Sequence, residues 1–529
     1  MNHDALIIGG GHNALVCAFY LARAGLKVRI LEARDVIGGA AVTEEFHPGF
    51  RNSVASYTVS LLQPKVIADM RLADHGYRVI ERPISNFLPQ EDGGYLKLGG
   101  GLERTQAEFH RFSEHDASVL PDYYAMLESV ADVLRDLALK SPPNVGGGIK
   151  TLIDAALQGR NLIKLSLSKQ RDVLDLFTKS ARTFLDGWFE SEAVKAAFGF
   201  DAVVGNYASP DTPGSAYVLL HHVFGEVNGN KGAWGHAIGG MGAITQAMAT
   251  VCRDAGVEIS LESPVSRVLV ESSRAVGVRL VSGEELYASV VIANVGPKLL
   301  YDRLFDEGDL EPEFKRRMKG FKAGSGTFRM NVALSELPRF TCLPEPGEHL
   351  QSGIIIAPTL DYMDRAFADA KQYGWSRAPI VEMLIPSIID DSLAPPGQHV
   401  ASLFCQQFAP GHDWDADEGA AADTIIDTVE AYAPGFRASI LGQMILSPKG
   451  LERKFGLIGG DIMHGNMSLD QLWSARPMLG HGAYRGPMKG LYMASAGTHP
   501  GGGVTGAPGH NCAQEVIADR SVLGKLLRR

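Results

Sequence analysis

The residues GGGHNA near the start of the chain fit the dinucleotide-binding pattern G-x-G-x-x-G/A. They lie between an apolar run at residues 5–8, which is typical of a buried parallel strand, and apolar residues at helical spacing over 15–24. In this pattern the glycines permit a tight turn and a close approach of the backbone to a pyrophosphate. The diphosphate would bind free N–H groups at the helix N-terminus, where the helix dipole favours negative charge. The residues predicted to hold the dinucleotide are Gly9, Gly11, His12, Asn13 and Ala14.

An acidic residue follows the second predicted strand. Residues 26–31 have the composition of that strand, and Glu32 ends it. Its carboxylate can accept hydrogen bonds from the hydroxyls of an adenosine ribose, and it would repel the 2′-phosphate of NADP. The order of strand, glycine turn, helix, strand and acid therefore predicts dinucleotide binding. The alternative is a glycine-rich turn without a ligand.

Residues 34–43, RDVIGGAAVT, resemble the R-x-x-G-G-x-x-x-T element of the GR2-type flavoproteins, which include amine oxidases, protoporphyrinogen oxidases and phytoene desaturases. The resemblance implies that the dinucleotide is FAD. It also implies that the glycine pair passes close to the phosphate and ribityl region, where a Cβ atom would clash. On this resemblance the cofactor site also includes Ala33, Arg34, Gly38, Gly39, Ala40 and Ala41.

Further segments resemble the phytoene dehydrogenase-related family, including its desaturase-type carotene ketolases. They are the GGMG element at 239–242, the stretch 455–477 and the loop GTHPGGGVTGAPGHN at 497–511. In this superfamily the C-terminal strand, loop and helix close over the flavin, where the positive end of the helix dipole stabilises the reduced form. The resemblance adds Val265, Asn294, Gly497, Gly502, Gly503 and Val504 to the cofactor site.

The fold class expected from these features is α/β, with a GR2-type FAD-binding Rossmann-like domain and an inserted α+β substrate domain. We expect the FAD domain to take residues 1–80, 236–320 and 451–529, the last part closing over the flavin. The substrate domain should take 81–235, with a helical insertion, and 321–450, which supplies its sheet. Apolar periodicity predicts a helix over 113–139 with Ser113 or Asp116 as its cap. Strands of the substrate domain are expected near 329–334, 353–356, 380–385 and 399–408, and a helix is expected near 417–432.

Composition limits the class of protein. The chain has 529 residues, 45% of them hydrophobic, and a net charge of −10, which argues against nucleic acid as a partner. Its five cysteines are far apart and form no C-x-x-C, so a disulfide framework and a redox-dithiol mechanism are not expected. This usage and the immediate start of the first strand predict a cytoplasmic protein.

Residues 149–176 predict a basic amphipathic helix, with leucines and isoleucines set against lysines and arginines. Such a face can lie on a membrane and admit a lipid-soluble substrate, so a peripheral membrane contact is one interpretation. The other is an ordinary surface helix that faces its own core.

Three histidines are candidates for catalysis. The resemblance implies hydride transfer from a C–H bond to the flavin, with loss of a proton to a base or to water. His499 and His510 flank the C-terminal loop, and His464 lies in the MHGNMS stretch; each could act as a base or hydrogen-bond the flavin. The alternative for each is a structural hydrogen bond to a loop backbone. No metal-binding motif is present in the sequence, and no metal is expected.

Three functions remain open. The first is an FAD-dependent oxidoreductase acting on a hydrophobic, polyene or isoprenoid-like small molecule, which predicts an apolar tunnel to the flavin. The second is an oxidase of an amine or another small polar molecule, which predicts a compact pocket with a polar or aromatic cage. The third is a flavoprotein with a binding or regulatory role. Because the sequence has one full nucleotide-binding fingerprint, we expect the electron acceptor to be oxygen, a quinone or a carrier protein.

Overall fold

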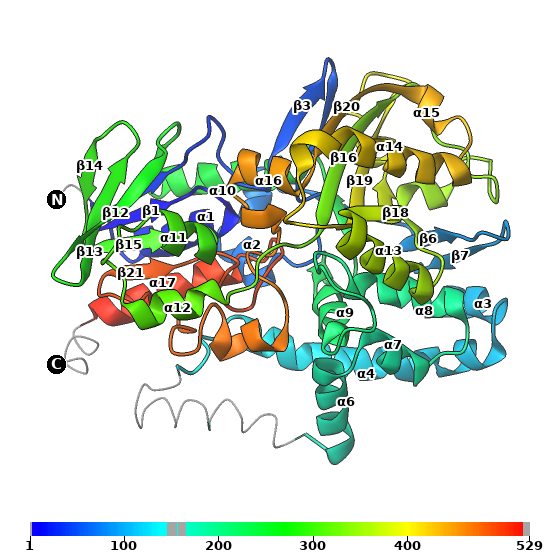
Figure 1. Cartoon of the computed structure of the whole chain (residues 1–529), viewed down its shortest axis with the longest axis horizontal. Coiled ribbons are helices and arrows are strands. Elements are labelled where there is room, and N and C mark those ends of the chain that lie inside the picture. Colours follow the sequence, from blue (N-terminus) through cyan, green and yellow to red (C-terminus); the bar gives the residue numbers. More distant parts are fainter. Residues whose placement is uncertain (1–2, 145–155, 157–164, 522–529) are drawn as a thin grey trace.

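The first apolar run forms β1 (Ala5–Ile8), the middle strand of a five-stranded parallel sheet in this computed structural model, which describes residues 3–144, 156 and 165–521. All four residues of β1 are buried, as expected for a parallel strand covered on both faces. Across the sheet the order is β11 (Glu258–Ser260), β2 (Val28–Leu31), β1, β15 (Val290–Ala293) and β21 (Leu491–Met493). The sheet therefore joins three segments that are far apart in the sequence (Figure 1).

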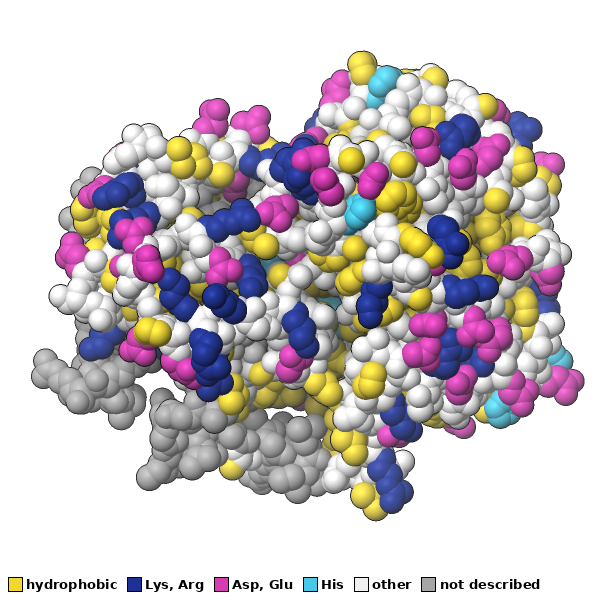
Figure 2. Space-filling model, viewed as in Figure 1, with side chains coloured by type: hydrophobic (Ala, Val, Ile, Leu, Met, Phe, Trp, Pro, Cys, Tyr) yellow, Lys and Arg dark blue, Asp and Glu magenta, His cyan; other side chains and the backbone are white. Residues whose placement is uncertain are grey.

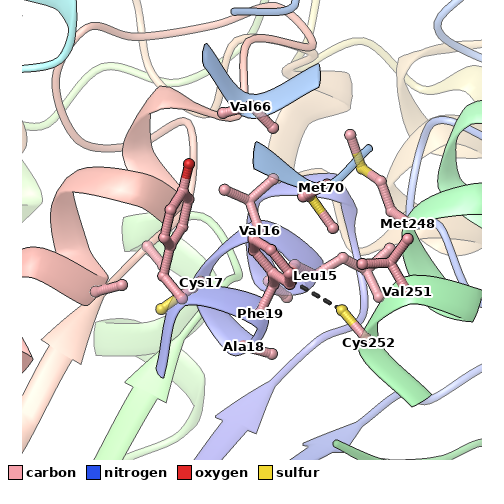
Figure 3. Close-up of a cluster of buried hydrophobic side chains, with 14 of the residues drawn as sticks. Leu15, Val16, Cys17, Ala18, Phe19, Val66, Met70, Met248, Val251 and Cys252 are labelled. Atoms are coloured by element: carbon pink, nitrogen blue, oxygen red, sulfur yellow. Dashed lines mark hydrogen bonds between the residues drawn. The ribbon is translucent and has the colours of Figure 1, made fainter. Parts of the chain in front are cut away.

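Three helices pack around the core of this lobe. They are α1 (His12–Arg23), α10 (Met241–Asp254) and α17 (Ala507–Arg520), and α1 contacts the other two. Figure 3 shows Leu15 and Val16 of α1 beside Val66 and Val251, with the Cys252 thiol donating to the Leu15 carbonyl at 3.1 Å. Helix α17 has Pro508 in its first turn, where proline is well accommodated.

A second, seven-stranded sheet forms the other lobe (Figure 1). In order across the sheet its strands are β20 (Ile440–Leu446), β16 (Thr327–Leu334), β19 (His399–Phe408), β18 (Trp375–Leu384), β17 (Gly353–Ile356), β6 (Asn86–Pro89) and β7 (Tyr95–Leu98). The four strands predicted for this sheet are its centre. Strands β6 and β7 come from a distant part of the chain, and β6 pairs with β17 in parallel. Helices α13 (Leu360–Tyr373) and α14 (Trp414–Tyr432) pack on this sheet.

A helical layer lies below the second sheet in Figure 1. Its members are α3 (Leu102–His110), α4 (Glu114–Ala138), α6 (Leu167–Thr178), α7 (Ala181–Asp186), α8 (Glu192–Gly199) and α9 (Ser215–Val223). Ser113 caps α4, since its Oγ accepts from the Asp116 N–H at 3.1 Å. Most of the amphipathic helix predicted over 149–176 lies outside the described residues; its last part is α6, where Leu167 and Leu174 are exposed.

Shorter elements complete the two lobes. The strands are β3 (Thr43–His47), β4 (Phe50–Ser53), β5 (Val79–Glu81), β8 (Glu226–Val227), β9 (Asn230–Lys231), β10 (Gly235–Ala237), β12 (Val265–Glu271), β13 (Arg274–Leu280) and β14 (Glu285–Tyr287). The helices are α2 (Pro64–Asp69), α11 (Pro297–Arg303), α12 (Pro312–Lys319), α15 (Phe436–Ser439) and α16 (Pro448–Phe455). Acidic and basic side chains are intermixed over the face in Figure 2. Among the helices that the structure describes, none is long and apolar enough to cross a membrane.

A buried arginine joins the C-terminal segments. Arg476 is fully buried, and its guanidinium donates to backbone carbonyls from two parts of the chain. The acceptors are Met463, Gly465, Asn466, Gln471 and Ala496, at 2.7–3.2 Å. Burial lowers the pKa of Arg476 to about 10, so it stays cationic at neutral pH. It thus ties the 463–471 stretch to the end of β21.

We expect Arg476→Met to lower the thermal unfolding midpoint strongly. The variant keeps an apolar stem but takes the guanidinium away from five backbone carbonyls, of which Asn466 still accepts from the Gln471 side chain. This loss should cost about 3 kcal/mol or more. The matched control is Arg316→Met, because Arg316 is exposed and, within the part of the chain that the structure describes, pairs with Glu313 of its own helix alone. Equal midpoints for the two variants, measured by circular dichroism, would contradict the role given to Arg476.

Candidate active site

A cavity of about 460 Å³ opens at the carboxyl ends of β1 and β2 and extends between the two lobes. It gathers residues that the sequence predicted from four separate segments. The predicted cofactor residues on its wall are Gly9, Gly11, His12, Asn13, Glu32, Ala33, Arg34, Gly39, Ala40, Ala41, Val265, Asn294, Gly503 and Val504. Of the candidate catalytic histidines, His464 lies on this wall. The position agrees with the general rule that open α/β sheets bind ligands beyond the carboxyl ends of their strands.

The N-terminus of α1 is open toward this cavity. Gly11 is the residue before the helix, its backbone is extended, and no side chain caps the first turn. The first N–H groups of a helix need partners, and an anion can supply them. Gly39 lies against the start of this helix, and a Cβ atom added to Gly39 would lie 2.9 Å from the Gly11 Cα. The φ of +59° at Gly39 also favours glycine.

The carboxylate of Glu32 is held in place by the backbone. Glu32 is only 6% exposed; its Oε2 accepts from the Gly10 N–H at 2.7 Å and its Oε1 accepts from the Arg34 N–H at 2.9 Å. These two bonds fix the carboxylate at the end of β2, on the cavity wall. It is therefore placed to accept a hydrogen bond from a ribose hydroxyl.

Several buried polar atoms on the cavity wall have no partner among the described residues. They are His12 Nε2, Asn13 Oδ1, Arg34 Nη1 and His464 Nδ1. Burial, together with repulsion from His464, lowers the pKa of His12 to about 3, and burial beside Arg476 lowers that of His464 to about 4. Both imidazoles are neutral at pH 7 and can offer hydrogen bonds. Buried polar groups are normally satisfied, so these atoms and the uncapped helix fit a polar ligand such as the diphosphate of FAD.

Four predicted cofactor residues pack behind the wall and do not line the cavity. Ala14 is buried within α1, and Gly38 fits tightly beside Thr245. A Cβ on Gly497 would collide with Pro297, and one on Gly502 would collide with Met463. These positions need a small residue for packing between segments of the protein.

His499 and His510 are also turned away from the cavity. His499 Nε2 donates to the Leu137 carbonyl at 3.1 Å, and its ring lies edge-on to Trp473. His510 Nδ1 bonds Asn511 Oδ1 at 2.8 Å, and its ring packs against Tyr20. The loop between them brings Gly503 and Val504 to the wall, but neither imidazole lines the cavity. No group of three or more His, Cys, Asp or Glu side chains is placed to hold a metal ion within the described ranges.

A second chamber of about 360 Å³ adjoins the first. The two share Tyr57, Thr58, Val204, His222 and Trp234 on their walls. Sequence reasoning did not single out Val204, His222 or Trp234, because none belongs to a local motif. Apolar side chains that line this chamber include Leu98, Leu127, Phe198, Phe200, Leu219 and Val223.

Charged groups also face this chamber. Arg82, Asp201 and Glu382 line it, and they come from three distant parts of the chain. The Tyr57 hydroxyl donates to Glu382, and Arg82 donates to Thr58 Oγ1 at 2.6 Å. Burial raises the pKa of Glu382, although the nearby Arg82, the Tyr57 hydrogen bond and Arg329 oppose this. The chamber is thus an apolar space with a charged region in its wall.

The parallel sheet, the uncapped helix and the acid at the end of β2 define a Rossmann-type flavoprotein oxidoreductase, and comparison with known proteins agrees. The family model of flavin-containing amine oxidoreductases matches residues 15–327, and the chain belongs to this family. FAD is its cofactor, and the protein is an FAD-dependent oxidoreductase of the amine oxidase and desaturase superfamily.

The chain is 40% identical to pyridine nucleotide-disulfide oxidoreductase domain-containing protein 2 of Rattus norvegicus, over 98% of this chain and 94% of that protein. It is 25% identical to a lycopene-forming phytoene desaturase of Pseudescherichia vulneris, over 95% and 96% of the two chains. A solved structure of putrescine oxidase superposes with a TM-score of 0.62 at 15% identity, covering 100% of both chains, and supports the fold.

We expect Gly11→Val to abolish retention of FAD. A Cβ at this position would lie 3.0 Å from Asn294 Nδ2, so the valine methyl groups would fill the space in front of the helix. Glu32→Ala should only weaken retention, because it removes ribose hydrogen bonds and leaves the helix open. The readout is flavin absorbance per mole of purified protein. Gly411→Val is the control, since nothing lies within 4 Å of a Cβ there; a Gly11→Val protein with full flavin would refute this assignment.

We expect His499→Gln to keep flavin and flatten the acid dependence of stability. Burial lowers the pKa of His499 from 6.5 to about 3. Below pH 6.5 the unfolded chain takes up a proton that the folded protein does not, so stability falls as the pH drops toward 3, by about 1.4 kcal/mol per pH unit. Glutamine can still donate to Leu137. Urea unfolding at pH 7 and pH 5 measures how the free energy of unfolding changes with pH, and His115→Gln, at an exposed histidine, is the control. A structural role for His499 would be contradicted if the His499→Gln protein kept the wild-type pH dependence. It would also be contradicted if the flavin of this variant could no longer be reduced.

Proposed function

We propose that the protein oxidises a C–H bond of a largely apolar organic substrate, and that the second chamber holds this substrate. The observation that supports the proposal is the shared wall of the two cavities, formed by Tyr57, Thr58, Val204, His222 and Trp234. A molecule in the chamber would reach the cofactor cavity without crossing solvent. The similarity to a phytoene desaturase supports an isoprenoid-like substrate.

Within this proposal, the groups of the chain have separate tasks. The N–H groups at the start of α1 bind the diphosphate, and Glu32 binds the ribose. When bound, FAD supplies the group that accepts a hydride. A substrate bound in the second chamber would displace water from the junction, which would strengthen electrostatic interactions there. We infer that oxygen, a quinone or a carrier protein takes the electrons, because the sequence holds one nucleotide-binding fingerprint.

A membrane contact would suit such a substrate. Leu167 and Leu174 of α6 are 63% and 60% exposed, and Lys169 and Arg171 of the same helix are exposed between them. Apolar side chains flanked by basic ones can rest on an anionic lipid surface. This contact is part of the proposal.

Anaerobic reduction of the flavin tests the proposed function. Terpenoid hydrocarbons, terpenoid alcohols and alkylamines are mixed with the flavin-loaded protein, and loss of the oxidised-flavin absorbance is followed. We expect lipophilic compounds to reduce the flavin, and Val204→Trp to slow this at least tenfold while FAD stays bound, because the indole would block the junction of the cavities. Val281→Trp on the surface is the control. Reduction by small amines alone would favour an amine oxidase, and an unaffected Val204→Trp protein would refute the placement of the substrate.

A further inference from the structure

One carboxyl group in the second chamber has no partner. Asp201 lies in a short 3₁₀ turn directly after α8, and its side chain lines the chamber. Among the described residues, no donor lies within hydrogen-bond distance of its carboxyl oxygens, and no cation pairs with it. Asp201 is half-buried, so its carboxyl oxygens face the space of the chamber. A polar group of a ligand bound in the chamber could supply the missing hydrogen bond.

The neighbouring Glu382 already has its compensating groups. Tyr57 donates to it, and the positive charges of Arg82 and Arg329 act on it. Arg329 is itself fully buried and lies over the Tyr57 ring at 4.6 Å. Burial, together with the repulsion from Glu382, raises the pKa of Asp201 to about 8. At pH 7 it is a neutral acid that can both donate and accept a hydrogen bond.

Other titratable groups near Asp201 do not change this conclusion. Tyr123 and Tyr124 of α4 have pKa values raised by burial, and His222 of α9, whose pKa burial lowers to about 4, is neutral. Glu128 and Lys231 on the chamber wall pair with each other at 2.9 Å. Arg82 faces the same chamber, so a substrate ammonium group would meet a guanidinium there.

We propose that the substrate carries one hydroxyl or carbonyl oxygen and that the Asp201 carboxyl hydrogen-bonds this oxygen inside the chamber. This inference rests on the proposed function, because it assigns the chamber to the substrate. The apolar wall formed by Phe198, Phe200 and Leu219 would hold the hydrocarbon body. A neutral carboxylic acid suits such a group, because it donates to a carbonyl or ether oxygen and also accepts from a hydroxyl.

The test compares three probes of equal length in the flavin-loaded protein: 1-octanol, octane and octylamine. Binding is measured from the perturbation of the flavin spectrum under anaerobic conditions. We expect 1-octanol to bind at least tenfold more tightly than the other two at pH 7. Asp201→Leu should remove this preference, and Asp201→Asn should keep it, because an amide also donates and accepts. Asp122→Asn, on the exposed side of α4, is the matched control.

The pH dependence provides a second measurement that does not depend on the folding of Asp201→Leu. Since the wild-type carboxyl loses its proton near pH 8, the affinity for 2-octanone, whose carbonyl can only accept a hydrogen bond, should fall between pH 7 and pH 9 in the wild type and stay constant in Asp201→Asn. The inference would be overturned if octylamine bound more tightly than octanol and its affinity rose above pH 8. It would also be overturned if octane and octanol bound equally tightly at pH 7.

The failure of this inference can be separated from failure of the proposed function. If octanol binds through Asp201 but no lipophilic compound reduces the flavin, the oxidation of such substrates fails and the assignment of Asp201 stands. If lipophilic hydrocarbons reduce the flavin and the protein binds octanol no more tightly than octane, the proposed function stands and the role of Asp201 is refuted.

Discussion

The uncapped N-terminus of α1 is the constraint that the surrounding structure satisfies. A helix start without a capping side chain leaves N–H groups that only water or an anionic ligand can satisfy. Here the missing cap coincides with a second glycine loop, so that Gly39 lies against Gly11 with no side chain between them. The backbone of the protein thus leaves room for a diphosphate where a cap would otherwise stand. The placement of β2, Glu32 and Asn294 around this point follows from the parallel sheet that carries them.

The far wall of the same cavity depends on a different interaction. The 463–471 stretch has little regular secondary structure, and a loop of this kind needs other partners for its carbonyls. The guanidinium of Arg476 has five N–H groups, and with them one side chain donates to several of these carbonyls. His464, with a φ of +56°, is held in this stretch and lines the cofactor cavity, as does His12. Burial and, to a smaller extent, the positive charge of Arg476 lower the pKa of His464 and keep it neutral.

Local patterns in the sequence predicted those parts of the structure that local interactions determine. The strand and helix around the first glycine motif, the Ser113 cap and the strands β16–β19 follow from periodicity and capping over a few residues. The joining of β6 to β17, by contrast, depends on a pairing between residues 86 and 353, which no short pattern records. The same reason applies to Arg82, Asp201 and Glu382, which meet in one chamber from three segments. His499 and His510 show that closeness in sequence does not place a side chain in the site. They flank the loop that reaches the cavity, but their rings hydrogen-bond Leu137 and Asn511 instead.

The charged wall of the second chamber bears on the choice between substrates. A tunnel for a pure hydrocarbon gains nothing from buried charges, because each ionised group costs several kcal/mol to desolvate. The chamber nevertheless keeps a guanidinium and two carboxyl groups beside aromatic walls, and it satisfies one carboxylate internally through Tyr57. Such an arrangement is consistent with selection for a polar group on an otherwise apolar molecule. The neutral Asp201 carboxyl could hold such a polar group by a hydrogen bond in the chamber that adjoins the cofactor cavity.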